Sequence, residues 1–223
     1  MPLKAIFFDI DGTLVDSNDF HVMAWQEAFR DHGHSIQRDR IRAEIGKGAD
    51  QLIPALLPHA DNAFEKAVGH RQAEIFQTRY LKQVKPFPCA AALIDMLSTK
   101  GKLVVLASSA GKPEVDHYVE LLGVGHALTG TVSKDDVKNS KPAGDIFAAA
   151  LASVFPLSAT ETLAIGDTPY DVESALKSDI KTIALRSGGV SEEALANAGA
   201  LYIFASVKEL FERYESSPLR EST

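Results

Sequence analysis

Short apolar segments alternate with helical patterns along most of this chain, and this alternation limits the folds that it can adopt. The apolar segments span residues 5–8, 103–107, 163–165, 182–185 and 201–204, with a weaker candidate at 128–132. Helical spacing of apolar residues predicts helices over 90–99, 113–122, 143–154, 169–177 and 207–214. The pattern predicts a doubly wound, Rossmann-like parallel α/β sheet with helices on both faces. Such sheets bind ligands beyond the carboxyl ends of their strands.

Residues 16–85 interrupt the alternation, because they contain no convincing strand. Apolar side chains instead recur at helical spacing, as at Phe20, Ala24 and Ala28. We therefore expect a helical cap over 16–85, inserted into an α/β core made of residues 1–15 and 86–215. Pro86 and Pro88 mark the return to the core, and the polar tail, 216–223, is expected to be frayed.

Composition excludes several classes of partner. The net charge is −7 and the sequence has no cluster of Lys and Arg, so nucleic acid and anionic membrane surfaces are poor candidates. No run of about 18 apolar residues is present, and the apolar N-terminal stretch is too short and too soon acidic for a signal peptide. Cys89 is the single cysteine, which fits the reducing cytoplasm, and we predict a cytoplasmic protein.

Polar residues follow the predicted strands at the points where a parallel sheet binds its ligands. They are Asp9 and Asp11 after the first strand, Ser108 and Ser109 after 103–107, Lys141 before a helix, and Asp167 and Asp171 after 163–165. Each group alone has an ordinary structural explanation, such as a turn or a helix N-cap. Hydroxyls and free backbone N–H groups at a strand–helix junction also suit a phosphate.

Together the four groups predict one acidic site. Two carboxylates about 4 Å apart repel by about 4 kcal/mol at an effective dielectric constant of 20, so four acids need cations beside them. Lys141 and a hard, oxygen-liganded cation such as Mg²⁺ would supply that charge. We expect the pKa of Asp11 to be raised by burial and by its acidic neighbours.

These motifs, in this order, resemble those of the haloacid dehalogenase superfamily, in its phosphatase branch. The resemblance implies that Asp9 is the nucleophile and that Asp11 is the general acid and then the base. It assigns phosphoryl binding to Ser108 and Lys141. It assigns Mg²⁺ binding to Asp9, the Asp11 backbone carbonyl and Asp167, with Asp171 supporting the metal directly or through water. An acid at position 11 argues against dehalogenase and phosphonatase chemistry.

Two segments of the predicted cap bear on the substrate. The loop 45–52 is similar to the cap loop of phosphoglycolate phosphatases, so Lys47 is either a contact for a substrate carboxylate or a solvated lysine. The segment 16–25 resembles that of β-phosphoglucomutases, so His21 either approaches Asp11 or is a locally satisfied helix residue. The mutase loop has an arginine that is missing here.

We therefore predict an Mg²⁺-dependent hydrolase of small phosphate monoesters that forms an aspartyl-phosphate. Phosphoglycolate is the leading substrate, a small phosphorylated metabolite is the expected partner, and a monomer is what the resemblance implies. A sugar phosphomutase is the main alternative. A non-enzymatic binding module is disfavoured, because all of the catalytic positions are filled.

Overall fold

Six parallel strands form the central sheet of the computed structural model, which describes residues 2–220. In the order β5-β4-β1-β6-β7-β8, the strands are β5 (Gly130–Val132), β4 (Leu103–Ala107), β1 (Ala5–Phe8), β6 (Thr162–Gly166), β7 (Lys181–Leu185) and β8 (Tyr202–Phe204). Phe8 pairs with Leu106 on one side and with Ile165 on the other, so the three central strands end level with one another. The predicted parallel sheet is confirmed.

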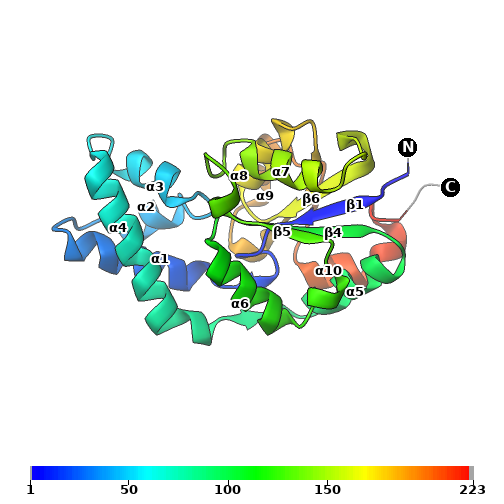
Figure 1. Ribbon diagram of the computed structural model, residues 1–223, viewed down its shortest axis with the longest axis horizontal. Coiled ribbons are helices and arrows are strands. Elements are labelled where there is room, and N and C mark those ends of the chain that lie inside the picture. Colours follow the sequence, from blue (N-terminus) through cyan, green and yellow to red (C-terminus); the bar gives the residue numbers. More distant parts are fainter. Residues whose placement is uncertain (1, 221–223) are drawn as a thin grey trace.

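Both faces of the sheet are covered, and the first strand shows why. Ile6 and Phe8 pack into one apolar cluster, whereas Ala5 and Phe7 pack into another on the opposite face. Successive strand residues point to opposite faces, so a strand buried on both sides must be apolar throughout. In Figure 1, α5 (Ala90–Thr99), α6 (Lys112–Leu122) and α10 (Val207–Glu212) lie on one face. The other face carries α7 (Asp145–Ser153), α8 (Pro169–Leu176) and α9 (Glu192–Asn197).

The remaining helices gather beyond the carboxyl ends of the strands, away from both chain termini (Figure 1). We call these the cap helices: α1 (Asn18–Asp31), α2 (Arg38–Arg42), α3 (Ala49–Leu56), α4 (Asn62–Ile75), the π-helix η1 (Phe76–Tyr80) and the 3₁₀ turn η2 (Leu81–Gln83). Ala24 and Ala28 are buried in α1, as their spacing predicts, together with Val22, Trp25 and Phe29, whereas Phe20 is only partly buried. The chain enters the cap helices through β2 (Val15–Asp16) and leaves them through β3 (Lys85–Pro86). These two strands pair as a short antiparallel ribbon, which was not predicted from the sequence.

Five further 3₁₀ turns connect the elements of the core: η3 (Gly125–Ala127), η4 (Lys134–Asp136), η5 (Ala159–Glu161), η6 (Arg186–Gly188) and η7 (Tyr214–Ser216). The expectation of a frayed tail is wrong for its described part. Leu219 is fully buried in the core, and the Ser217 hydroxyl donates to the Tyr214 carbonyl over 2.9 Å. One apolar side chain in a polar tail is enough to anchor it. Residues 221–223 lie outside the described part of the chain. Within residues 2–220, no helix is long and apolar enough to span a membrane.

Candidate active site

A buried lysine organises the carboxylates at the end of the sheet. Lys141 has no exposed side-chain surface, and its ammonium lies 2.8 Å from both the Ala107 carbonyl oxygen and Asp171 Oδ1, and also binds Asp9. Burial alone would lower the pKa of Lys141, but the charges of Asp171 and Asp9 outweigh it and raise that pKa. The ammonium is therefore fixed in its charged form between two acids.

Asp167 completes a group of three buried carboxylates with Asp9 and Asp171, whose oxygen atoms lie within 4.8 Å of one another. Burial, reinforced by the charges of Asp9 and Asp171, raises the pKa of Asp167 well above its usual range. Burial likewise raises the pKa of Asp9 to about 7, although Lys141 opposes the shift. One ammonium thus faces three carboxylates, an imbalance that fits a divalent cation with oxygen ligands.

The backbone leaves room for the Asp167 carboxylate. A Cβ atom on Gly12 would lie 2.2 Å from Asp167 Oδ2, and one on Gly188 would lie 1.7 Å from the same oxygen. Thr13 Oγ1 donates to Asp167 Oδ1 over 2.9 Å, and Asn18 Nδ2 donates to Oδ2 over 3.0 Å. The carboxylate is therefore held in one orientation between two glycines and two donors, as a metal ligand requires.

Asp171 is engaged on both of its oxygen atoms. Oδ2 accepts from the Thr168 backbone N–H over 3.0 Å and from the Thr168 hydroxyl over 2.6 Å, which caps helix α8. Oδ1 faces Lys141. Asp171 therefore fixes the start of α8 and the position of the lysine at the same time.

Asp11 lies apart from this group, and its Oδ1 atom accepts three hydrogen bonds. The donors are Ser17 Oγ at 2.6 Å, His21 Nε2 at 3.0 Å and Tyr118 Oη at 3.1 Å. Burial would raise the pKa of Asp11, but His21 and these hydrogen bonds outweigh it and lower that pKa. The expected upward shift is wrong. Sequence reasoning offered His21 as a neighbour of Asp11, as the structure shows, but did not indicate Ser17 or Tyr118.

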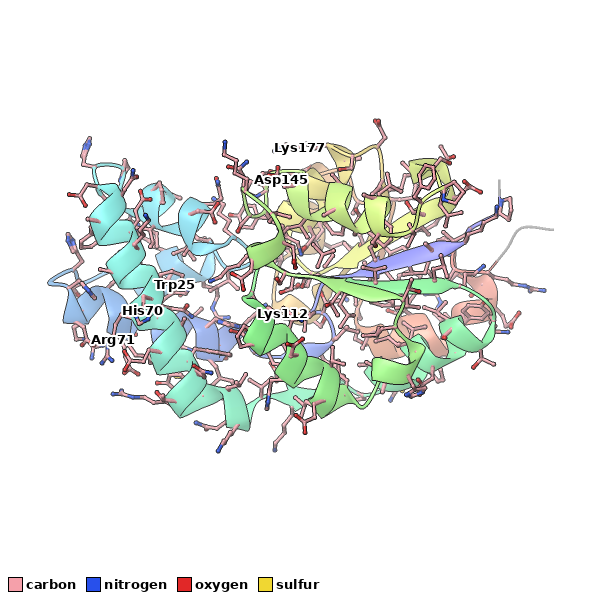
Figure 2. The ribbon with its side chains drawn as sticks, viewed as in Figure 1. Trp25, His70, Arg71, Lys112, Asp145 and Lys177 are labelled. Carbon is pink, nitrogen blue, oxygen red and sulfur yellow. The ribbon has the colours of Figure 1, made fainter. Side chains whose placement is uncertain are left out.

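A cleft of about 330 Å³ separates the cap helices from the core and exposes the reactive groups. Asp9, Asp11, Ser108 and Ser109 line its core side, and His21 lines its cap side. In Figure 2, Trp25, which also lines the cleft, lies among the cap helices, and Lys112 lies at the start of α6 across from them. Lys141, Asp167 and Asp171 are not among the lining residues, so they support the floor of the cleft from behind.

The two serines and Lys47 meet at the boundary between core and cap helices. Ser109 Oγ donates to the Gly46 carbonyl over 3.3 Å, whereas Ser108 Oγ accepts from the Ala110 backbone N–H over 3.0 Å. Lys47 lines the cleft, but its ammonium pairs with Glu44 and lies 4.5 Å from the centre of the Tyr170 ring.

Known proteins share both this sequence and this architecture. The sequence profile of the haloacid dehalogenase-like hydrolases matches residues 6–185. The chain belongs to this hydrolase family. It is 30% identical to a phosphoglycolate phosphatase of Rhodospirillum rubrum, and the match covers 90% of this chain and 86% of that one. It is also 30% identical to the SUPPRESSOR OF QUENCHING 1 protein of Arabidopsis thaliana, where the match covers 88% of this chain but only 19% of that protein.

Solved structures of other proteins have the same fold. A hydrolase from Pseudomonas syringae superposes with a TM-score of 0.91 at 26% identity, covering 99% of this chain and 100% of that one. A candidate β-phosphoglucomutase from Bacteroides vulgatus gives a TM-score of 0.87 at 23% identity, covering 96% and 88% of the two chains. The predictions of the family and of a phosphatase are confirmed.

The haloacid dehalogenase-like site contains residues that sequence reasoning missed. They are Thr13, Asn18, Glu114, Tyr118 and Lys134. Lys134 lies two residues after the end of β5, so the rule that found the other groups could have found it had that strand been clearer. Glu114 and Tyr118 lie four residues apart on α6, and their spacing alone places them on one helix face. Nothing in the sequence says that this face meets Asp11.

Proposed function

We propose that the chain is an Mg²⁺-dependent hydrolase of small phosphate monoesters that works through an aspartyl-phosphate on Asp9. The observation that carries the proposal is the separation of the acids into two groups. Asp9 lies at the floor of the cleft, with Asp167, Asp171 and Lys141 buried behind it, whereas Asp11 is held apart by its own donors. One carboxylate can therefore attack while the other moves a proton.

In the first step, an Asp9 carboxylate oxygen attacks phosphorus and the bond from phosphorus to the leaving oxygen breaks. Asp11 gives its proton to that oxygen, which leaves as an alcohol. In the second step, Asp11 takes a proton from water as the water oxygen attacks phosphorus, and Asp9 is released. Lys141 and the Ser108 and Ser109 hydroxyls bind the phosphoryl oxygens during both steps.

Asp9, Asp167 and the backbone carbonyl of Asp11 are the proposed metal ligands, and Asp171 supports them through Lys141. When bound there, Mg²⁺ neutralises charge on the phosphoryl oxygens. A divalent cation beside Asp9 also lowers the pKa of that nucleophile, because the cation favours the charged carboxylate. A phosphoryl dianion next to Asp11 acts in the opposite direction and raises the pKa of the general acid.

The cap helices, with 16–85 as the proposed cap, would close over the substrate and exclude water. Phosphoglycolate is the first substrate to test, because relatives carry that name and Lys47 lies in the cleft. Lys134 is a second candidate for its carboxylate. Its half-buried side chain lines the cleft, and its ammonium has no ion pair with any residue that the structure describes. The single cysteine and acidic composition support a cytoplasmic location.

The test is phosphate release from a panel of phosphorylated metabolites, with isomerisation of glucose 1-phosphate measured alongside. We expect turnover of small monoesters, loss of turnover in EDTA and recovery with Mg²⁺. No arginine lies among the described residues that line the cleft, so we expect no isomerisation. Full activity in metal-free buffer, or isomerisation faster than hydrolysis, would refute this proposal.

A further inference from the structure

Glu114 is a half-buried acid that lines the cleft, and the proposed reaction has no use for it. Its side chain is 18% exposed, and the charge of Lys134 acts on it, but no lysine or arginine among the described residues forms a close ion pair with it. Glu114 Oε1 instead lies 3.4 Å from His21 Nε2 and 3.4 Å from Tyr118 Oη. These are two of the three donors that bind Asp11 Oδ1, and each has a single hydrogen, which Asp11 and Glu114 share. A carboxylate that is partly withdrawn from water beside another acid is costly unless donors satisfy it, so its place beside these donors requires an explanation.

The two shared donors come from opposite sides of the cleft. Tyr118 is a fully buried residue of core helix α6 and lies one helical turn after Glu114. His21 belongs to cap helix α1, where its ring stacks on Phe76 at 3.9 Å between ring centres and 8° between planes. Both donors are therefore held in place by their own surroundings as well as by the acids.

The geometry has a consequence for the two oxygens of Asp11. Oδ1 receives three donors, whereas no hydrogen bond to Oδ2 exists among the described residues. The lone pairs of Oδ1 are occupied, so a proton can be exchanged at Oδ2 only. The orientation of that oxygen depends on the donors that fix Oδ1.

We propose that Tyr118 and Glu114 are positioning residues for the general acid. The Tyr118 hydroxyl binds Asp11 Oδ1 directly, and Glu114 holds Tyr118 and His21 in the positions from which they reach it. The carboxyl group of Asp11 is thereby turned so that Oδ2 meets the leaving oxygen. This inference rests on the proposed role of Asp11.

The expected signature is a dependence on the leaving group. An alkoxide needs a proton as it leaves, whereas p-nitrophenolate leaves without one. General acid catalysis contributes about 10²–10⁴-fold, and a misdirected acid loses part of it. We expect Tyr118→Phe to slow phosphoenzyme formation from an alkyl phosphate by about ten- to a hundred-fold. With p-nitrophenyl phosphate the change should stay below about three-fold.

The experiment measures single-turnover phosphoenzyme formation from both esters in Tyr118→Phe, Glu114→Gln, Glu114→Ala and Asp11→Asn proteins. Tyr80→Phe is the matched control, because its hydroxyl binds Glu27 and it does not line the cleft. Gln keeps an oxygen that accepts from Tyr118 and His21, so Glu114→Gln should recover most of the rate that Glu114→Ala loses. Thermal melts identify any variant that fails to fold, and Glu114→Ala then replaces Tyr118→Phe in the comparison of the two esters.

The outcomes separate this inference from the proposed function. If Asp11→Asn selectively slows the alkyl ester but Tyr118→Phe slows both esters equally or neither, the positioning role is overturned and the function stands. Equal losses in Glu114→Gln and Glu114→Ala would likewise overturn the role of Glu114. If Asp11→Asn itself shows no selectivity, the assignment of Asp11 as the acid fails, and this inference fails with it.

Discussion

Replacing Lys141 by methionine should destabilise the protein far more than the loss of one surface charge would. Its ammonium is completely buried and faces both Asp9 and Asp171. Methionine fills a similar volume without charge, so the variant would leave these acids, together with Asp167, without their buried cation. Breaking a buried pair by removing one partner costs about 3–5 kcal/mol. For a chain of this size, that corresponds to a fall in melting temperature of roughly 6–20 °C.

The loss should depend on pH in a definite direction. The pKa of Asp9 is already raised to about 7, so this group can take up a proton in the folded state. A raised carboxyl pKa stabilises the folded state at low pH, and this contribution is lost as the pH rises from about 4 to about 7. Removal of Lys141 raises that pKa further. The substitution should therefore lower the free energy of unfolding less at pH 5 than at pH 8.

The assay is urea unfolding in EDTA at both pH values, with Lys112→Met as the control. Lys112 also pairs with an aspartate, Asp116, at 2.9 Å, but its side chain is 58% exposed. An exposed pair of this kind contributes about 0–1 kcal/mol. Suppose that at pH 8 Lys141→Met lowers the free energy of unfolding by no more than Lys112→Met does. The buried ammonium would then not be the group that compensates the charge of Asp9 and Asp171.

Three further results are expected. Gly188→Ala should weaken Mg²⁺ binding by at least about ten-fold in calorimetry, because its Cβ would lie 1.7 Å from Asp167 Oδ2 and displace a ligand; unchanged affinity would remove Asp167 from the metal site. Mg²⁺ should raise the melting temperature more at pH 8 than at pH 5, because the raised pKa values of Asp9 and Asp167 make protons compete with the metal at low pH; an equal shift at both pH values would contradict this. Lys134→Ala should lower kcat/KM for phosphoglycolate by about ten-fold or more, and Lys47→Ala should lower it by less. Neither substitution should change kcat/KM for p-nitrophenyl phosphate. A lysine whose substitution lowers kcat/KM equally for both substrates is not the carboxylate contact.

The sequence was informative wherever a rule of chain geometry applied. The run from Ala5 to Phe8 could only be a doubly buried strand, and the acids after it had to emerge at the carboxyl edge of the sheet. Lys141 precedes a helix and does not follow a strand directly, but the same rule placed Ser108 and Asp167 near Asp9. Parallel strands that end level bring these side chains together whatever the loops do.

The parts that escaped prediction depend on packing between distant segments. Asn18 reaches Asp167 across 149 positions of the chain, and Tyr118 reaches Asp11 across 107. No local periodicity records such contacts. The predicted pKa of Asp11 is wrong for the same reason, because the donors Ser17 and Tyr118 could not be inferred from the sequence, although His21 could. Leu219 likewise looks like an exposed tail residue until the core that receives it is known.

Trapping the phosphoenzyme tests the central proposal most directly. The protein is mixed with substrate and Mg²⁺, quenched in acid within one turnover and digested, and mass spectrometry locates the phosphoryl group. The proposal predicts one acid-stable, hydroxylamine-sensitive phosphoryl group on the peptide that contains Asp9, and none in an Asp9→Asn protein that still folds. A phosphoryl group on another residue, or substantial turnover by folded Asp9→Asn, would contradict it.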